Sequence, residues 1–279
     1  MLYLDLLLLA ILQGVTELFP ISSLGHSVLV PALFHWPLDR AADWFLPYIV
    51  VLHLGTAGAL LLYFRRDWHA LLAGAWNARG RLDDPNAKLF WLLAAGTLPA
   101  AILGLLLEHK VREWFSGITV AAVFLMINGM LLLLGDWLKR RQSSGNPVSL
   151  SFGKALAIGC AQALALVPGI SRSGVTLVAG LGAGLDYAAS ARFSFLLATP
   201  IIAAAGVFEI PKLIQPHSRL PAVLLGVIIL GGVLSGLFAW FSTWFLMRWF
   251  RSHELMACRP FGIYCLVAGA SALVWNVFG

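Results

Sequence analysis

The sequence predicts an all-α integral membrane protein organised as an inverted repeat, in which each half is a re-entrant helical hairpin followed by three transmembrane helices. Three observations lead to this fold class: the composition, six long apolar runs, and two apolar regions that polar residues interrupt. Of the 279 residues, 60% are hydrophobic and 11% are charged, whereas roughly 25% are charged in an average soluble domain. So few polar side chains cannot cover a soluble globule, and the bilayer is the natural solvent.

Six apolar runs are long enough to cross the hydrocarbon core, which takes about 20 residues of helix. They are residues 44–64, 89–107, 117–137, 189–207, 221–246 and 260–278. Tryptophans such as Trp44, Trp114 and Trp137 stand near the ends of these runs, as in the aromatic belts of membrane interfaces. We therefore expect six transmembrane helices.

The basic residues predict the orientation of these helices. Lys and Arg gather in three stretches, at residues 65–88, 139–141 and 248–259. Because cytoplasmic loops carry an excess of basic residues, we place all three stretches in the cytoplasm, with residues 36–43 and both termini outside. The net charge of +6 is therefore explained by basic residues in cytoplasmic loops. We expect the protein to interact with the membrane and not with nucleic acid.

Two further apolar regions, residues 3–35 and 152–185, contain polar side chains near their middle. Glu17 and His26 interrupt the first region, and Arg172 interrupts the second. We expect each region to form two half-helices joined by a polar turn, because irregular backbone inside a membrane is tolerated only within protein or beside water. With the orientation above, the first hairpin enters from outside and the second from the cytoplasm.

The two hairpins open the two halves of the predicted repeat. The stretch PISSLG at residues 20–25 resembles PGISRSG at 168–174. We place the first half at residues 1–138 and the second at 151–279, joined by a cytoplasmic linker, 139–150, within one membrane domain. Inverted repeats with interrupted helices bind their ligands near the midplane, at the interface of the repeats.

The second hairpin carries an anion-binding pattern, PGISRSGVT at residues 168–176. Its glycines allow close backbone approach, its hydroxyls donate hydrogen bonds, and the guanidinium of Arg172 matches two phosphate oxygens. A helix is expected to begin just after the turn, so that its free N–H groups and positive dipole end face the anion. A plain Ser/Gly-rich turn is the alternative, but it would not place an arginine within the membrane.

The first hairpin offers groups for catalysis. Gln13 and Glu17 are four residues apart and share a helix face. A carboxylate repels a diphosphate unless a hard divalent cation lies between them, so we predict Mg²⁺ or Ca²⁺ bound by Glu17 and Gln13. Ser23 and His26, three residues apart, suit a nucleophile and its general base. A core histidine bonded to a backbone carbonyl is the more common case, and a structural ion pair between the hairpins is the alternative for Glu17 and Arg172.

At these two clusters the sequence resembles the undecaprenyl-diphosphate phosphatase family linked to bacitracin resistance. That family is marked by [E/Q]xxxE followed by PxSSxGH, by PGxSRSxxT and by FSFLLAxP. The matching stretches are Gln13–Glu17, Pro20–His26, Pro168–Thr176 and Phe193–Pro200. The resemblance covers essentially the whole chain. One departure is His53, which stands where other members carry glutamine before Leu-Gly.

The resemblance implies an enzyme that hydrolyses undecaprenyl diphosphate to undecaprenyl phosphate and inorganic phosphate, recycling the lipid carrier of cell-wall synthesis. It implies that Glu17 is a metal-linked carboxylate, Ser23 the nucleophile and His26 its acid/base partner, with Arg172 completing the catalytic set. The residues assigned to substrate binding are Ser22, Gly169, Ser171, Arg172, Ser173, Gly174 and Thr176. The expected partners are the polyprenyl diphosphate lipid and the membrane, with a homodimer as a possible assembly.

Two other functions fit parts of the pattern. A transporter or flippase for a phosphorylated lipid has the same architecture, but it needs no nucleophile or base. An intramembrane serine protease could use Ser173, although the neighbouring arginine favours phosphate over a peptide carbonyl. For the enzyme we expect a bacterial inner-membrane protein whose site faces the periplasm. Half-helices of about 14 residues reach only ~21 Å, and a diphosphate is too polar to cross the core easily.

Overall fold

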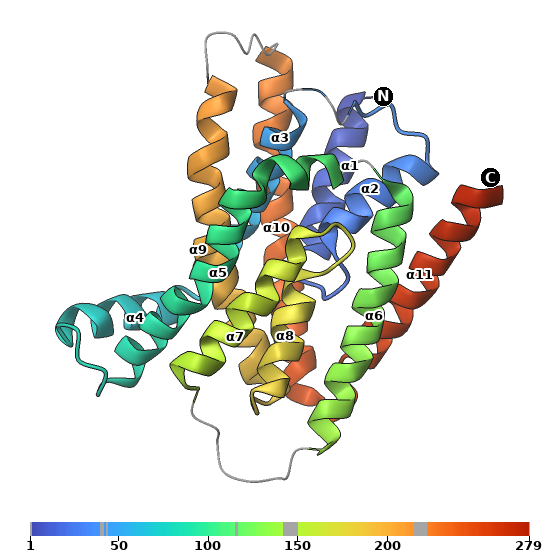
Figure 1. Cartoon of the computed structure of the whole chain (residues 1–279). Coiled ribbons are helices and arrows are strands. Elements are labelled where there is room, and N and C mark those ends of the chain that lie inside the picture. The colour runs from blue at the N-terminus through green and yellow to red at the C-terminus, as the bar shows by residue number, and fades with distance from the viewer. Residues whose placement is uncertain are drawn as a thin grey trace.

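The computed structural model describes residues 2–39, 42, 44–114, 117–141, 150–214 and 222–278, and for 108–114, 207–214 and 222 it describes the backbone alone. Within these residues every regular element is helical (Figure 1). The elements are α1 (Leu2–Thr16), α2 (Ser23–Leu33), α3 (Phe45–Tyr63), α4 (Arg65–Asn77), α5 (Pro85–Trp114), α6 (Ile118–Arg141), α7 (Phe152–Ala163), the 3-10 helix η1 (Leu164–Leu166), α8 (Arg172–Gly182), α9 (Tyr187–Ile214), α10 (Ala222–Ser252) and α11 (Arg259–Phe278).

The six predicted transmembrane helices are confirmed by length and composition. The helices able to cross a membrane are α3, α5, α6, α9, α10 and α11, and each overlaps one predicted run. Four of them extend further than the apolar runs by more than one residue: α5 and α9 at both ends, and α6 and α10 at their C-terminal ends, to Arg141 and Ser252. Lys139, Arg140, Arg141 and Arg251, which were expected in loops, therefore occupy the last turns of α6 and α10, where the negative end of the helix dipole favours cations.

Both interrupted regions fold as helix–turn–helix hairpins, as the sequence predicts. In the first hairpin, residues 17–22 join α1 to α2, and in the second, residues 167–171 join η1 to α8. Figure 1 shows the hairpins extending from opposite ends of the bundle, so that their turns lie in its interior. α6 packs along α11 and α3 packs along α10, which encloses the hairpins in longer helices.

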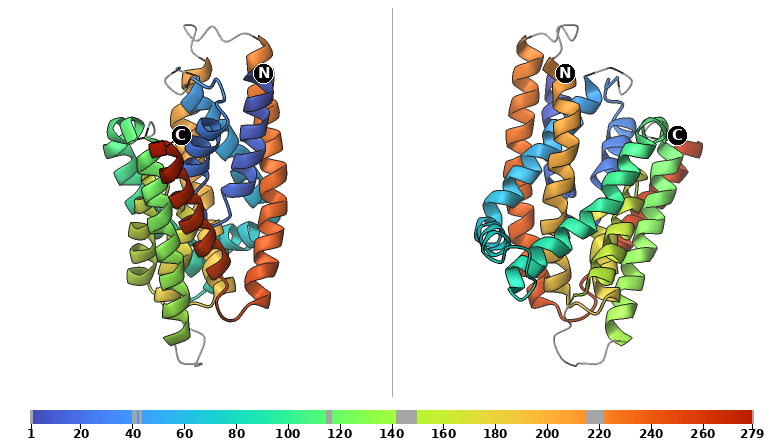
Figure 2. Two further views of the ribbon diagram at one scale, coloured as in Figure 1. Left: turned by 90° about the vertical axis from the view of Figure 1, so that its right-hand side faces the viewer. Right: turned by 60° about the vertical axis from the view of Figure 1, so that its left-hand side comes forward.

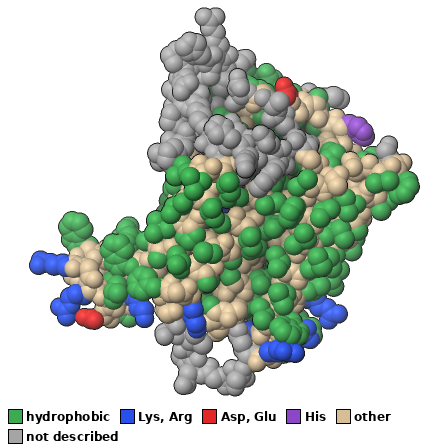
Figure 3. All heavy atoms as spheres, in the orientation of Figure 1, with side chains coloured by type: hydrophobic (Ala, Val, Ile, Leu, Met, Phe, Trp, Pro, Cys, Tyr) green, Lys and Arg blue, Asp and Glu red, His purple; other side chains and the backbone are tan. Residues whose placement is uncertain are grey.

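The two termini lie toward one end of the molecule (Figure 2), and in Figure 3 the Lys and Arg side chains gather toward the other. That basic end includes α4, a short helix that was expected to be loop. α4 is amphipathic and buries Leu71, while Trp76 is 84% exposed. Arg192 of α9 holds α4 through an ion pair with Asp67. Most of the predicted linker lies outside the described residues.

Candidate active site

The turns of the two hairpins are joined by one residue of α6, Asn128. Its Nδ2 donates to the Pro20 carbonyl at 2.8 Å, and its Oδ1 accepts from the Ser171 backbone N–H at 3.0 Å. The backbones also approach closely, because a Cβ added to Gly25 would lie 3.2 Å from the Gly169 Cα. Asn128 is fully buried, so these two hydrogen bonds form where water cannot replace them.

Two helix N-termini point into the site, one from each hairpin. Ser22 caps α2 by accepting from the Gly25 N–H at 3.2 Å, and Ser171 caps α8 by accepting from the Gly174 N–H at 3.1 Å. Serine is a preferred N-cap residue because its hydroxyl satisfies an otherwise unpaired N–H group. The remaining free N–H groups and the two positive dipole ends make this region suited to an anion.

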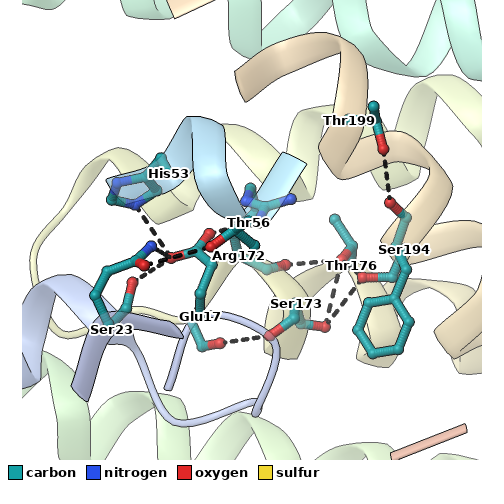
Figure 4. A network of polar contacts seen from close by, with 12 residues as sticks. Glu17, Ser23, His53, Thr56, Arg172, Ser173, Thr176, Ser194 and Thr199 are labelled. Atoms are coloured by element: carbon teal, nitrogen blue, oxygen red, sulfur yellow. Dashed lines mark hydrogen bonds and ion pairs between the residues drawn. The ribbon is translucent and has the colours of Figure 1, made fainter. Parts of the chain in front are cut away.

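Glu17 lies at the centre of a charged cluster (Figure 4). Its Oε1 accepts from Arg172 Nη2 at 2.5 Å, and its Oε2 lies 3.1 Å from His53 Nε2. The Ser23 hydroxyl donates to the same Oε2. The side chains of Glu17, Arg172 and His53 are 5%, 15% and 18% exposed. The ion pair between Glu17 and Arg172 that the sequence suggested is therefore present, and its carboxylate also accepts a hydrogen bond from the Ser23 hydroxyl.

Gln13 orients this carboxylate from α1. Its Nε2 lies 3.4 Å from Glu17 Oε2. Its Oε1 accepts from the hydroxyls of Ser235 and, at 3.3 Å, Thr56. The shared helix face predicted for Gln13 and Glu17 is confirmed, and Gln13 is held by α3 and α10 at once.

A cavity of about 310 Å³ opens above this cluster. Its polar side is formed by the two hairpins and α3, and its apolar side by residues of α5 and α9, most of them alanine or glycine. The polar residues that line it are Glu17, Ser22, Ser23, His53, Gln162, Ser171 and Arg172, and the apolar residues of the long helices are Ala100, Ala101, Gly104, Leu105, Ile201, Ala204 and Ala205. The cavity thus joins an anion-binding floor to walls that suit a hydrocarbon chain.

The predicted site residues divide into two groups in this structure. Those lining the cavity are Glu17, Ser22, Ser23, Ser171 and Arg172. The others hold the hairpins in place. Ser173 Oγ donates to the Phe19 carbonyl of the other hairpin at 3.1 Å, and the Thr176 and Ser194 hydroxyls, 2.5 Å apart, join α8 to α9.

The glycines of the second motif serve backbone packing. Gly169 has φ +103°, and a Cβ there would lie 2.8 Å from the Leu125 backbone nitrogen, so only glycine fits the turn against α6. Gly174 donates its N–H to the Ser171 cap. Direct contact of Gly169, Ser173, Gly174 and Thr176 with a substrate stays a prediction.

His26 points toward α11 instead of toward Ser23. Its Nδ1 lies 2.7 Å from the Ser22 carbonyl, its Nε2 lies 2.7 Å from the Tyr264 hydroxyl, and the two rings stack. In the part of the chain that the structure describes, no hydrogen bond joins His26 to Ser23. Ser22 has φ 68°, which strains a non-glycine residue, and the bond from His26 holds that turn. This geometry matches the alternative considered from the sequence, in which His26 is a core histidine bonded to a backbone carbonyl and not the general base of Ser23.

Two site residues were missed by the motif analysis, His53 and Asn128. Each is a polar residue near the middle of a predicted membrane span, and intramembrane ionisable or polar residues are functional candidates by default. The predicted helix over residues 44–64 placed His53 within the membrane but could not show that it faces Glu17. The run over residues 117–137 likewise gave no reason to connect Asn128 with either hairpin.

The predicted divalent cation has one suitable protein ligand here. Among the described residues no group of three or more His, Cys, Asp and Glu side chains could hold a metal ion, and Glu17 is the only carboxylate that lines the cavity. Mg²⁺ often binds through one or two carboxylates with substrate phosphates and water completing its shell. Glu17 supplies such a carboxylate, although its two oxygens accept from Arg172 and Ser23 here, and a cation would take the place of one of these donors. The Gln13 oxygen is engaged by Ser235 and Thr56.

The helical bundle defines an integral membrane protein, and its cavity, with a charged floor and apolar walls, has the chemistry that a phosphorylated lipid would require. Residues 6–271 match the family model described as bacitracin resistance protein BacA, and the chain belongs to that family. It is 56% identical over 273 residues to undecaprenyl-diphosphatase 2 of Chromobacterium violaceum, covering 98% of both chains. It is 48% identical to the undecaprenyl-diphosphatases of Granulibacter bethesdensis (97% of this chain, 95% of that protein) and Acidiphilium cryptum (98% and 97%).

Proposed function

We infer that the chain is an undecaprenyl-diphosphatase. It hydrolyses undecaprenyl diphosphate to undecaprenyl phosphate and inorganic phosphate, which recycles the lipid carrier of peptidoglycan synthesis and underlies bacitracin resistance. The observation that carries this function is the cavity, in which a floor of Arg172, Ser23 and Glu17 adjoins apolar walls from α5 and α9. A polyprenyl diphosphate has the same two parts in one molecule.

The floor binds the diphosphate through charge and hydrogen bonds. Arg172 contacts Glu17 through one nitrogen, and a guanidinium has five N–H donors in a fork that matches phosphate. The N-termini of α2 and α8 add N–H groups and positive dipole ends. The prenyl chain lies between α5 and α9, where alanine and glycine leave room for it.

Ser23 is the nucleophile, and Glu17 is the group placed to receive its proton. When the Ser23 Oγ–P bond forms, the bridging P–O bond breaks and its electron pair leaves on undecaprenyl phosphate. Glu17 takes the serine proton and passes it to that leaving oxygen. In the second step water attacks the phosphoserine, Glu17 accepts a proton from the water and returns it to Ser23 Oγ, and inorganic phosphate is released. His26 supports this step by holding Ser22.

A divalent cation, Mg²⁺ or Ca²⁺, would be held by Glu17 together with diphosphate oxygens. Bound there, it would neutralise charge on the transferring phosphoryl group. The cation would also offset the repulsion between the Glu17 carboxylate and the diphosphate. The Gln13 amide keeps the carboxylate in place from α1.

The two halves of the chain form an inverted repeat, 1–138 and 151–279. Reciprocal packing supports this relation, since α1 packs on α10 and α7 packs on α5. Both contacts use a glycine against backbone: a Cβ at Gly14 would lie 2.9 Å from the Ser235 Cα, and a Cβ at Gly159 would lie 2.9 Å from the Gly96 Cα. Each hairpin therefore packs on a helix of the other half.

The protein lies in the bacterial inner membrane with its site open to the periplasm. The basic end marks the cytoplasmic face, so the first hairpin enters from the periplasm. In a background lacking Cys160, Cys258 and Cys265, Leu24→Cys, at a cavity-lining position, should react with a membrane-impermeant thiol reagent in intact spheroplasts. Labelling only after the cytoplasmic side is opened would overturn this orientation.

The decisive experiment for the function is phosphate release from undecaprenyl diphosphate by the purified protein. Hydrolysis lost in Ser23→Ala separates the enzyme from the runner-up, a transporter of a phosphorylated polyprenyl lipid. A transporter needs the anion donors but not the serine–carboxylate pair. Transport of the intact diphosphate without phosphate release would favour the transporter.

A further inference from the structure

Gln162 of α7 is a buried amide with no protein partner. Its side chain is 2% exposed, and neither Nε2 nor Oε1 has a hydrogen bond to any of the described residues. It lines the cavity beside the charged floor. Gln13 on the other hairpin is equally buried, but its amide has Ser235, Thr56 and Glu17 as partners.

Packing against α5 fixes the level of Gln162 in the cavity. One turn before it, Gly159 contacts the backbone of Gly96, and one turn after it, Leu166 approaches Gly104, whose added Cβ would lie 3.8 Å from Leu166 Cδ2. Gln162 therefore lies level with Ala100, which also lines the cavity. The close backbone approach of Gly159 to Gly96 before Gln162, and the Leu166 side chain of η1 after it, hold this part of the second hairpin against α5.

An unpaired buried carboxamide is unfavourable, and native proteins leave very few such groups without a partner. Each carboxamide presents two N–H donors and an oxygen acceptor. The cavity already attracts anionic oxygens through Arg172 and the two helix N-termini. The ligand that satisfies the Gln162 amide is therefore one that brings acceptor oxygens to this floor.

We propose that Gln162 is a substrate-binding residue, whose Nε2 donates a hydrogen bond to a non-bridging oxygen of the diphosphate. This role rests on the proposed hydrolysis of a polyprenyl diphosphate at the same site. A neutral amide adds a donor without adding a charge that would compete with Arg172 for Glu17. Its rigid placement on α7 means that little side-chain freedom is lost when the substrate arrives.

The test compares Gln162→Leu with wild type in steady-state hydrolysis of undecaprenyl diphosphate and in inhibition by methylenediphosphonate, a non-hydrolysable diphosphate. We expect KM and the inhibition constant each to rise about tenfold, which corresponds to about 1.4 kcal/mol, with a smaller change in kcat. Gln162→Glu should be worse than Gln162→Leu, because its carboxylate repels the diphosphate. Asn276→Leu, which removes an exposed amide bonded to Thr119, should match wild type.

Thermal unfolding of the detergent-solubilised protein separates binding from folding. Leucine is close to glutamine in volume, and the substitution breaks no hydrogen bond within the described chain, so the unfolding midpoint of Gln162→Leu should equal or exceed that of wild type. A lower midpoint would show a structural amide and overturn the proposal. Unchanged KM and inhibition constant in a folded Gln162→Leu would also overturn it, as would wild-type KM in Gln162→Glu. In either case, continued hydrolysis by the wild type would leave the proposed function standing.

Discussion

Replacing Asn128 with leucine should damage the site although Asn128 itself does not line the cavity. The change removes one hydrogen bond to each hairpin turn, leaving the Pro20 carbonyl and the Ser171 N–H unpaired in a buried place. Each unpaired group costs about 1–3 kcal/mol, so the sum is about 2–6 kcal/mol. Hydrogen bonds measured in a membrane protein average only ~0.6 kcal/mol, which sets a lower bound of about 1 kcal/mol.

The consequence for catalysis should be larger than the consequence for stability. Asn128 aligns the turn that carries Glu17 with the turn that precedes Arg172, and a shift of about 1 Å in reacting groups can cost roughly 10²-fold in rate. We expect kcat for phosphate release to fall by about that factor while the unfolding midpoint falls by a few degrees. Asn128→Asp, whose carboxyl can accept from Ser171, should be milder. A folded Asn128→Leu with wild-type kcat would refute this role.

Three further predictions concern the site residues, each measured by phosphate release. Arg172→Lys should lose about 10²- to 10³-fold in kcat/KM, since a point charge cannot hold two phosphate oxygens. Activity near wild type would argue against a two-oxygen contact between Arg172 and the diphosphate. Wild-type activity should require Mg²⁺ or Ca²⁺, and Glu17→Gln should abolish the activity. Full wild-type activity in excess chelator would show that the reaction needs no metal. Losses in Ser23→Ala and His26→Ala should multiply in the double variant, because no bond joins the two side chains in the described structure. If the double variant were no less active than either single variant, the result would instead support the prediction from the sequence that Ser23 and His26 act together as nucleophile and base.

The fold could be predicted from local properties of the chain. Six runs of apolar residues identify their helices, because in a membrane the length and composition of a segment decide whether it spans. Polar residues in the middle of residues 3–35 and 152–185 identified both hairpins for the same reason. The short helix α4 was missed because it is amphipathic, and the basic stretch that contains it was assigned only by its charge.

The site could be predicted only where sequence spacing fixes geometry. Gln13 and Glu17 share a face because they are one helical turn apart, and the helix start at Arg172 follows from the serine that caps it. Spacing failed for Ser23 and His26, because contacts with Glu17 and Tyr264 from other elements decide where their side chains point.

The ion pair between Glu17 and Arg172 has a consequence for which ligands the site accepts. A ligand must draw the guanidinium away from a buried carboxylate 2.5 Å from it. A singly charged ligand would only replace one negative partner with another, whereas a diphosphate offers several charged oxygens and can engage Arg172 and both helix N-termini together. After hydrolysis each product carries less charge than the substrate, so Glu17 again competes effectively with the bound phosphate for the Arg172 guanidinium. We infer that this pair favours the diphosphate over its monophosphate product and assists product release. In chelator, where no cation links Glu17 to phosphate, Glu17→Gln should therefore bind undecaprenyl phosphate more tightly than wild type, measured as stronger product protection against thermal unfolding. Equal protection of both proteins by the monophosphate would show that the pair plays no part in release.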